Sequence, residues 1–410
     1  MKGGDGETGN VKNSILQAKN KHTNMSSRAS LKVGVEEDER DHQKLEQVLC
    51  MKGGDSEFSY AKNMAFQITV QATVKPVMEE GIKELYNTFL SSHDHIETLV
   101  VADLGCATGP IALLAISNII NIVGRSCDDS GRKSPSFFVL LNDLPSNDFN
   151  FIFKLLGEFY ILHQKEGREC FVAAAPGSFH SRLFPSKSVH FVHSSLALQW
   201  LSQVPKGLID ENGVALNKGN ICVGETSSLA VRAAYADQFK SDFDAFLKSR
   251  SKELILGGSM ILTFIGGDMT NALFKIVEVI GLTLADMARE DLINELKLDG
   301  VNFPIYPASL DQVREMILQE GSFEIRKLEI IKIGWDAGWD DKGDRASSKS
   351  ADRGEFVAKY MRAVFEVLLV AKFGEDVLDE VFGRAAVKYT ELMNVEDCQL
   401  HNIVVWVIRK

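Results

Sequence analysis

Residues 99–110 constrain the fold of this chain more than any other stretch. They read Leu-Val-Val-Ala-Asp-Leu-Gly-Cys-Ala-Thr-Gly-Pro, so an apolar run ends at Asp103 and two glycines precede a helical pattern. A buried strand, a glycine turn and a helix start bring the backbone close to a ligand. The spacing of Asp103, Gly105 and Gly109 differs from G-x-G-x-x-G, and it favours a ligand with an amino-acid end over a pyrophosphate. The alternative is an ordinary strand–helix turn of an α/β protein.

The composition narrows the classes of partner. The chain has 410 residues, 45% of them hydrophobic, which is enough for one large domain or two. A net charge of −11 without a basic stripe argues against nucleic acid. No apolar run approaches the roughly 18 residues of a membrane span, and the N-terminus has no apolar signal core, so we expect no membrane segment. The six cysteines are scattered without metal spacing, which indicates a reducing compartment such as the cytoplasm.

The first 44 residues differ from the rest of the chain. They are polar and nearly free of aromatic side chains, which predicts a disordered extension. They also contain a degenerate repeat, because residues 1–17 match residues 51–67 at nine of 17 positions. Either one copy is a relic or the two copies compete for one place.

From residue 45 onward, apolar runs alternate with amphipathic stretches, which predicts a doubly wound, mostly parallel α/β sheet of the Rossmann type. Two strand-like stretches near the C-terminus predict an antiparallel edge of the sheet. Helical patterns over about 266–326 and 340–400 predict a cap outside the sheet. We expect strands over 99–103, 137–143, 170–174, 189–195, 259–265, 323–333 and 402–408, and helices over 68–90 (interrupted near Pro76), 110–123, 149–162 and 235–254.

Four polar residues lie at or just beyond the carboxyl ends of expected strands: Asp103, Asp143, Ser178 and Ser194. Ligands of open α/β sheets bind at the carboxyl ends of the strands, so we expect these side chains to meet there. Asp143 follows the glycine turn by one strand–helix–strand step, where an acidic residue accepts hydrogen bonds from ribose hydroxyls. The alternative for Asp143 is a helix N-cap.

Other polar and aromatic residues near the strand ends carry weaker signals. His180, His190 and His193 show no zinc spacing, so packing and local hydrogen bonds are the expected roles. Ser178 is not in a Gly-x-Ser-x-Gly elbow, which argues against a hydrolase nucleophile. Trp200 fits core packing and a pocket wall equally well.

Several long motifs, in order, resemble one family of plant enzymes, the SABATH methyltransferases. These enzymes use S-adenosylmethionine (SAM) to methylate small carboxylic acids or the ring nitrogens of purine alkaloids. The resemblance runs from about residue 47 to the C-terminus. The matching stretches are 51–54 and 59–63, Ala102–Pro110, Leu141–Leu144, Asn147–Asn150, Pro176–Pro185, His193–Ser195, Trp200–Pro205 and Asn217–Gly219.

The resemblance implies a set of ligand residues. Those for SAM are Lys52, Tyr60, Asp103, Cys106, Asp143, Leu144, Ser178, Phe179, Ser194 and Ser195. It also implies a Mg²⁺ site at Asn217, Asp299, Asn302 and the backbone of Val301, whose role would be structural rather than catalytic. The family is often dimeric, so a homodimer is a further expectation.

The chain departs from the family pattern at three places. Met64 replaces a serine and Ile111 an asparagine beside the cofactor, so each removes a side-chain hydrogen bond worth about 0.5–1.5 kcal/mol. In the acceptor stretch, Leu196 replaces a tyrosine and Gln199 stands where histidine or methionine is common. Members that methylate purines use the tyrosine and the histidine, whereas carboxyl-methylating members use residues matching Gln67 and Trp200.

The retained pair, Gln67 and Trp200, favours transfer of a methyl group to a carboxylate. A carboxylic acid with a pKa near 4 is ionised at pH 7, so no general base is needed. The two neutral donors would orient the acid, and Phe66, Leu196, Leu198 and Gln199 would line its pocket. The sequence thus predicts a carboxyl O-methyltransferase. The alternatives are a purine-alkaloid N-methyltransferase and a non-catalytic paralogue.

Overall fold

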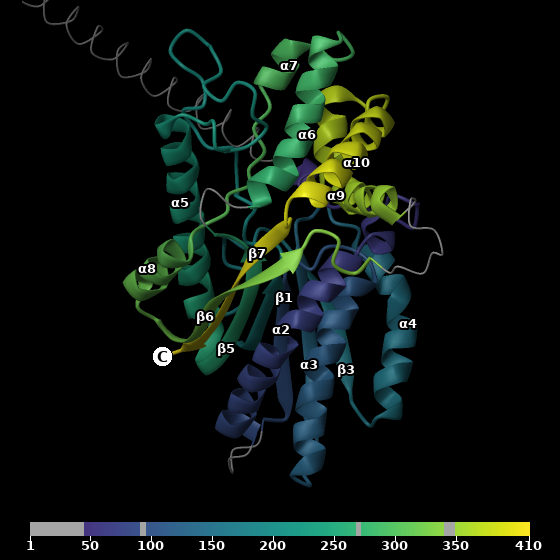
Figure 1. The fold of residues 1–410 in the computed structure, drawn as a ribbon. Helices are drawn as coiled ribbons and strands as arrows, with labels where there is room; N and C mark the ends of the chain where they lie inside the picture. The colour runs from purple at the N-terminus through teal and green to yellow at the C-terminus, as the bar shows by residue number, and fades with distance from the viewer. Residues whose placement is uncertain (1–44, 91–95, 268–271, 340–348) are drawn as a thin grey trace, which may run out of the picture. The chain divides into compact units, whose positions relative to one another are not determined.

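A seven-stranded sheet with the order β3-β2-β1-β4-β5-β7-β6 runs through the computed structural model (Figure 1). The structure describes residues 45–90, 96–267, 272–339 and 349–410. Residues 48–410 form one compact unit, and the predictions for residues 1–44 lie outside the described residues. The strands are β1 (Thr98–Leu104), β2 (Ser136–Asp143), β3 (Cys170–Pro176), β4 (Val189–Ser195), β5 (Leu254–Ile265), β6 (Phe323–Gly334) and β7 (Gln399–Arg409).

The strand directions confirm the predicted sheet. Strands β1 to β5 pair in parallel, and β7 runs antiparallel to both β5 and β6. Apolar runs buried on both sides are typical of parallel strands. The chain crosses from β3 to β4 on the far side of β1, so the strand order reverses between β1 and β4. The carboxyl ends of these two strands flank the crevice where α/β proteins bind ligands.

One face of the sheet is covered by α2 (Ala65–Leu85), α3 (Pro110–Asp129) and α4 (Phe149–Lys165). Helix α3 is long and apolar enough to cross a membrane, but its isoleucines lie buried against β1 and β2, which accounts for its apolar sequence. Helix α2 continues through Pro76, where an interruption is expected. Pro76 is exposed, so the carbonyl it leaves free can bind water, while Val74 and Val77 stay buried. A π-helical turn, η2 (Tyr86–Leu90), follows α2.

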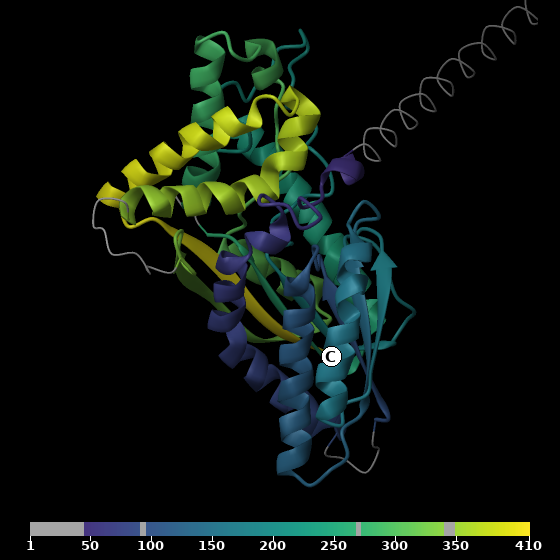
Figure 2. The same cartoon turned by 90° about the vertical axis from the view of Figure 1, so that its right-hand side faces the viewer.

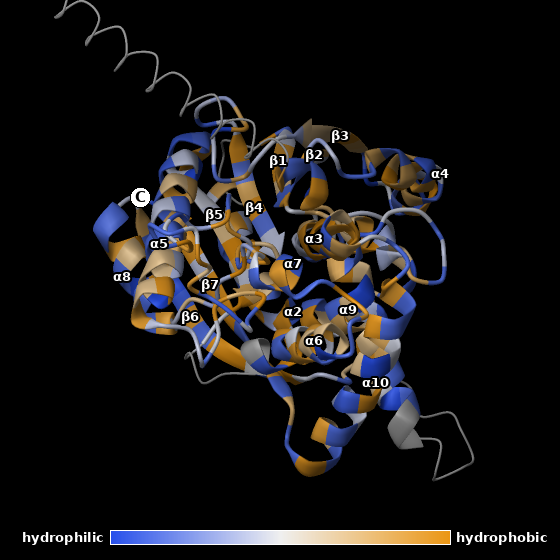
Figure 3. Ribbon diagram, turned by 90° about the horizontal axis from the view of Figure 1, so that it is seen from above, coloured by the Kyte–Doolittle hydropathy of each residue, from blue (hydrophilic) through white to orange (hydrophobic). Residues whose placement is uncertain are grey.

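The opposite face is covered by α5 (Leu229–Glu253) and α8 (Leu310–Glu320). Phe243 of α5 stacks on Phe246 of the same helix and packs at a tilted angle against Phe264 of β5. Helix α8 falls within the range expected for the cap, but it packs on α5 and β6. Viewed from above and coloured by hydropathy, the strands lie between helices that carry both orange and blue residues (Figure 3).

A helical cap lies across the carboxyl ends of the strands (Figure 2). It consists of α6 (Ala272–Arg289), α7 (Glu295–Asp299), α9 (Lys349–Phe373) and α10 (Leu378–Val395), which share one apolar core. The short 3-10 helix η1 (Tyr60–Lys62) contacts α9. The cap and η1 therefore close over the crevice between β1 and β4.

Candidate active site

The turn after β1 is a backbone cradle. Gly105 and Gly109 have φ angles of +68° and +85°, and the non-glycine residue Ala107 has a φ of +55°. A Cβ at Gly105 would lie 2.4 Å from the Cβ of Ala197 and 3.4 Å from the ring of Phe179. Position 105 therefore requires glycine, both for its backbone conformation and for the close approach of the next segment.

The end of β2 fixes this turn. One carboxylate oxygen of Asp143 accepts a hydrogen bond from the Ala107 N–H at 2.8 Å, and the other accepts one from the Leu144 N–H at 2.8 Å. The Asn147 amide donates to the Ala107 carbonyl at 2.8 Å. Burial raises the pKa of Asp143 to about 6, although the two backbone donors oppose the shift. The N-cap of α4 is Asp148, so Asp143 does not have the capping role that the sequence left open.

Asp103, at the end of β1, faces His193 on β4. The two residues are register partners, and the His193 Nδ1 atom lies 2.7 Å from the Asp103 Oδ1 atom. Both side chains are buried, so the imidazole holds one carboxylate oxygen and leaves the other available. The local hydrogen bonding expected for His193 and His190 is present, since His190 Nδ1 accepts from the Val100 N–H.

A polar cavity opens beside Asp103. It has an empty volume of about 310 Å³. The Oε1 atoms of Gln67 and Gln71 are buried and have no hydrogen-bond partner among the described residues. Unpartnered buried acceptors cost free energy unless a ligand supplies a donor. The lining residues are Tyr60, Gln67, Gln71, Asp103, Gly105, Cys106, Ala107, Ile111, Ala112, His193, Ser195 and Leu196.

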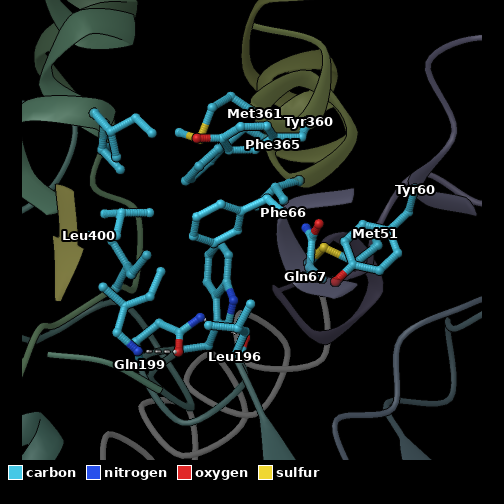
Figure 4. A pocket seen from close by; sticks show the side chains of 16 residues that line it. Met51, Tyr60, Phe66, Gln67, Leu196, Gln199, Tyr360, Met361, Phe365 and Leu400 are labelled. Atoms are coloured by element: carbon cyan, nitrogen blue, oxygen red, sulfur yellow. Dashed lines mark hydrogen bonds between the residues drawn. The ribbon is translucent and has the colours of Figure 1, made fainter. Parts of the chain in front are cut away.

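An apolar pocket of about 550 Å³ adjoins this cavity under the cap (Figure 4). Tyr60, Gln67 and Leu196 line both spaces, so they mark the boundary between them. None of the sixteen described residues around the pocket is charged. They are Met51, Tyr60, Phe66, Gln67, Leu196, Gln199, Trp200, Ile265, Ile276, Val277, Ile305, Tyr360, Met361, Val364, Phe365 and Leu400.

Aromatic rings shape the apolar pocket. Phe66 stacks on Tyr360 of α9 with ring centroids 5.3 Å apart, and Trp200 packs against Phe365 at 5.7 Å. The indole N–H of Trp200 makes no hydrogen bond within the described part of the chain, so it is free to donate to a ligand. Trp200 is thus a pocket wall in this structure.

Polar groups meet at the boundary between the two spaces. Gln67 hydrogen-bonds to Tyr60, and in Figure 4 its amide lies beside the Tyr60 ring. Burial raises the pKa of the Tyr60 phenol, so Tyr60 stays neutral. A half-turn of the Gln67 amide would let its oxygen accept from Tyr60 and free its NH₂ group as a donor.

Gln199 lines the apolar pocket, but its amide is engaged within the chain. Its Nε2 donates to the Leu196 carbonyl at 2.6 Å, and its Oε1 accepts from the Ile265 N–H at 3.4 Å, the dashed line in Figure 4. Leu196 has a φ of +57°, a conformation that is unfavourable for a leucine. Gln199 therefore holds a strained residue at the boundary of the two spaces.

Several residues expected at the site lie outside both linings. Lys52 forms an ion pair with Glu366 of α9 at 2.7 Å, and Ser194 donates to the Leu104 carbonyl at 2.8 Å. Asp143, Leu144, Ser178 and Phe179 also fall outside the linings, although Phe179 lies against the Gly105 turn. Leu198, expected in the acceptor pocket, is instead buried in the core beneath α5.

The residues expected to bind Mg²⁺ come close together but bond to one another. The Asn217 amide donates to Asn302 Oδ1 and accepts from Ser227, while Asp299 pairs with Lys218 at 3.8 Å. No cluster of three His, Cys, Asp or Glu side chains suited to a metal occurs in the described ranges. A lysine ammonium beside Asp299 opposes a divalent cation. The expectation of a magnesium site is therefore not supported.

Sequence reasoning missed part of the site. Tyr360, Met361 and Phe365 reach the apolar pocket from α9, and Ile276 and Val277 reach it from α6. A helical hydrophobic pattern does not tell which apolar residue faces a pocket and which faces the core. Gln71 was also missed, although its i+4 spacing from Gln67 places both amides on one face of α2.

The fold is that of an α/β protein with a polar cavity at the turn after its first strand and an apolar pocket under a helical cap. The structure resembles a solved loganic acid methyltransferase with SAH, with a TM-score of 0.76 and 32% identity over 88% of this chain and 98% of that one.

Family comparisons give the particular group. The family model of SAM-dependent carboxyl methyltransferases matches residues 46–410. The chain is 41% identical to jasmonate O-methyltransferase of Arabidopsis thaliana, over 83% of this chain and 92% of that protein. It is 40% identical to a benzoic acid/salicylic acid carboxyl methyltransferase of Petunia hybrida, over 88% of this chain and 97% of that protein. It is also 40% identical to probable caffeine synthase 4 of Coffea arabica, over 89% of this chain and 98% of that protein. The chain belongs to the SABATH family of SAM-dependent carboxyl methyltransferases.

Proposed function

We propose that this enzyme transfers the methyl group of SAM to the carboxylate of a small acid with an apolar body, aromatic or jasmonate-like, and releases a methyl ester. The observation that carries the proposal is the uncharged apolar pocket, which meets the polar cavity at Gln67 and Tyr60. An ionised acid with an apolar body matches a pocket whose polar groups lie at one end.

The polar cavity and its surroundings fit SAM. Gly105 lines the cavity with a backbone held in the left-handed conformation, and Asp103 supplies a buried carboxylate for an ammonium group. Asp143 lies at the next strand end, where its oxygens have further lone pairs for ribose hydroxyls, with Leu144, Ser178 and Phe179 nearby in sequence or space. When bound, SAM supplies an electrophilic methyl group on a sulfonium and leaves as S-adenosylhomocysteine (SAH).

The residues at the boundary align the acid. The Trp200 indole N–H and the Gln67 amide can donate to carboxylate oxygens without neutralising their charge. An arginine in their place would stabilise the bound acid more than the transition state. Holding the acid in line with the methyl group contributes up to about 7–11 kcal/mol to lowering the barrier. Phe66, Tyr360 and Phe365 exclude water from the acid's body.

The experiment is a product screen with methyl-labelled SAM against benzoate, salicylate, jasmonate, a fatty acid and xanthines. We expect label in acids only. Gln67→Ala should lose most of kcat/KM, whereas Gln319→Ala, an exposed glutamine on α8, should match the wild type. Label on xanthine nitrogens alone, with Gln67→Ala fully active, would favour the N-methyltransferase alternative. SAM binding without any transfer would favour a non-catalytic paralogue.

A further inference from the structure

Helix α2 presents two glutamine side chains to the polar cavity, and only one of them belongs to the boundary with the apolar pocket. Gln67 lines both spaces, whereas Gln71, one turn further along the helix, lines the polar cavity alone. Residues four apart lie on the same face of a helix. Gln71 therefore extends the polar lining from the boundary toward Asp103 and His193.

Gln71 is buried without the partner that a buried amide requires. Its residue is 8% exposed, and its Oε1 atom has no hydrogen-bond partner among the described residues. His193 is bonded to Asp103 and Tyr60 to Gln67, and neither supplies a donor to the Gln71 Oε1 atom. Buried side-chain acceptors in folded proteins almost always have a donor, and this one faces a cavity built for a ligand.

The rest of the cavity wall explains why a polar group is needed there. Helix α3 contributes Ile111 and Ala112, which offer only apolar surface. Ile111 packs in one cluster with Tyr60 and Ala363, and Met64 packs against that cluster. Ile111 and Ala112 can make no hydrogen bond through their side chains. The charged end of an amino acid bound in the cavity would find its acceptors on the other walls, which include Gln71 on α2 and Asp103 on β1.

We propose that Gln71 is a ligand of the methyl donor, whose Oε1 atom accepts a hydrogen bond from the ammonium group at the amino-acid end of SAM, beside Asp103. The inference rests on the proposed binding of SAM in the polar cavity. Gln71 then supplies on α2 the polar contact that Ile111 cannot supply from α3. It is a binding residue for the donor and does not touch the acid.

Calorimetry with two ligands tests this assignment. SAH carries the amino-acid end, and 5′-methylthioadenosine has the same nucleoside without it. Gln71→Met keeps the side-chain volume and removes the amide. We expect its dissociation constant for SAH to rise about tenfold or more, as for loss of a hydrogen bond to a charged group, while binding of methylthioadenosine changes less than about twofold. Gln71→Glu keeps an acceptor oxygen and should bind SAH within about threefold of the wild type.

The outcomes separate this inference from the proposed function. Failure of the wild type to bind SAH at millimolar concentration would overturn the proposed function itself. A wild type that binds SAH, with a Gln71→Met variant of equal affinity, would overturn only the role of Gln71. Equal losses for SAH and methylthioadenosine would also overturn it, since they indicate a deformed cavity. Should the Met variant not fold, loss of SAH binding in Gln71→Glu with methylthioadenosine binding retained would count against the proposal.

Discussion

The Nδ1 atom of His193 lies 2.7 Å from the Oδ1 atom of Asp103, and the two residues are direct register partners across β1 and β4. This pair ties together the two strands between which the order of the sheet reverses. The Asp103 carboxylate, which we propose to bind SAM, is therefore fixed by a side chain of β4. The chain continues from β4 into the lining of the apolar pocket.

His193 is expected to act through Asp103. His193→Val removes the donor and leaves a buried carboxylate unpaired, so the KM for SAM and the dissociation constant for SAH should rise about tenfold, or roughly 1.4 kcal/mol. His193→Asn keeps a donor and should recover most of the loss. Calorimetry with SAH checks both variants. Equal losses of SAH affinity in His193→Val and His193→Asn would show that His193 contributes through packing rather than through its hydrogen bond.

Trp200 is expected to act on the acid alone. Trp200→Phe keeps an aromatic ring against Phe365 and removes the indole N–H. The kcat/KM for the acid should fall about tenfold, since a donor to a charged group contributes about 1.5–3 kcal/mol, while the KM for SAM stays constant. Steady-state kinetics with each substrate varied in turn measures both values. A rise in the KM for SAM, with kinetics toward the acid unchanged, would show that Trp200 contacts the methyl donor instead of the acid.

Donor binding should weaken at acidic pH because of Asp143. Its pKa is raised to about 6 in the folded chain, so protonation between pH 7.5 and 5 removes an acceptor, and the dissociation constant for SAH should rise. The unfolding free energy changes in the opposite direction. The folded state binds the proton more tightly than the unfolded state, so this group's contribution to the unfolding free energy increases as pH falls through about 6 to 4. Asp143→Asn should bind SAH more weakly and lose this pH dependence. A variant that keeps the wild-type pH profile would assign the titration to another group.

Gln199 should stabilise the chain around Leu196, which lies between the polar cavity and the apolar pocket. Gln199→Leu removes the hydrogen bond to the carbonyl of Leu196, which has a φ of +57°, and the one from the Ile265 N–H. We expect the unfolding free energy to fall by about 1–3 kcal/mol and the KM for the acid to rise. Urea denaturation and acceptor kinetics measure the two effects. An unchanged midpoint with a raised KM would mean that the amide contacts the acid directly, as the sequence suggested.

Gly105 and Gly131 form a matched pair for testing the backbone cradle. Their φ angles are +68° and +65°, but only at Gly105 would a Cβ meet another atom closely, the Cβ of Ala197 at 2.4 Å; at Gly131 nothing lies within 4 Å. Each change to alanine should cost about 1–2 kcal/mol for the left-handed backbone. Only Gly105→Ala should also lose SAH affinity. Thermal unfolding measures the loss of stability, and calorimetry measures the loss of SAH affinity. Equal SAH binding in Gly105→Ala and Gly131→Ala would argue against a ligand at this turn.

The sequence predicted the sheet well because its signals are local. Each strand is an apolar run bounded by glycine or polar residues, and the paired registers place Asp103 next to His193 and Asp143 at the end of β2, near the turn. The motif around Asn147 is explained by its hydrogen bond to Ala107, which holds the turn in its unusual conformation.

The acceptor pocket was less predictable because it is built from distant segments. Tyr360 and Phe365 come from a helix more than 150 residues after Trp200. Gln199 was expected to contact the substrate, but the strained backbone that engages its amide cannot be read from residue types. Leu198 lies one residue from a pocket residue and still faces the core, since neighbouring residues of a loop point in different directions.

The most direct test of the account is the chemical form of the transferred methyl group. Purified enzyme is incubated with methyl-labelled SAM, the best acid of the screen and xanthine, and the products are treated with alkali. The account predicts a methyl ester, so the label is released as volatile methanol, and Trp200→Phe yields about a tenth as much. Label that stays non-volatile, bound to nitrogen of a purine acceptor, would contradict it.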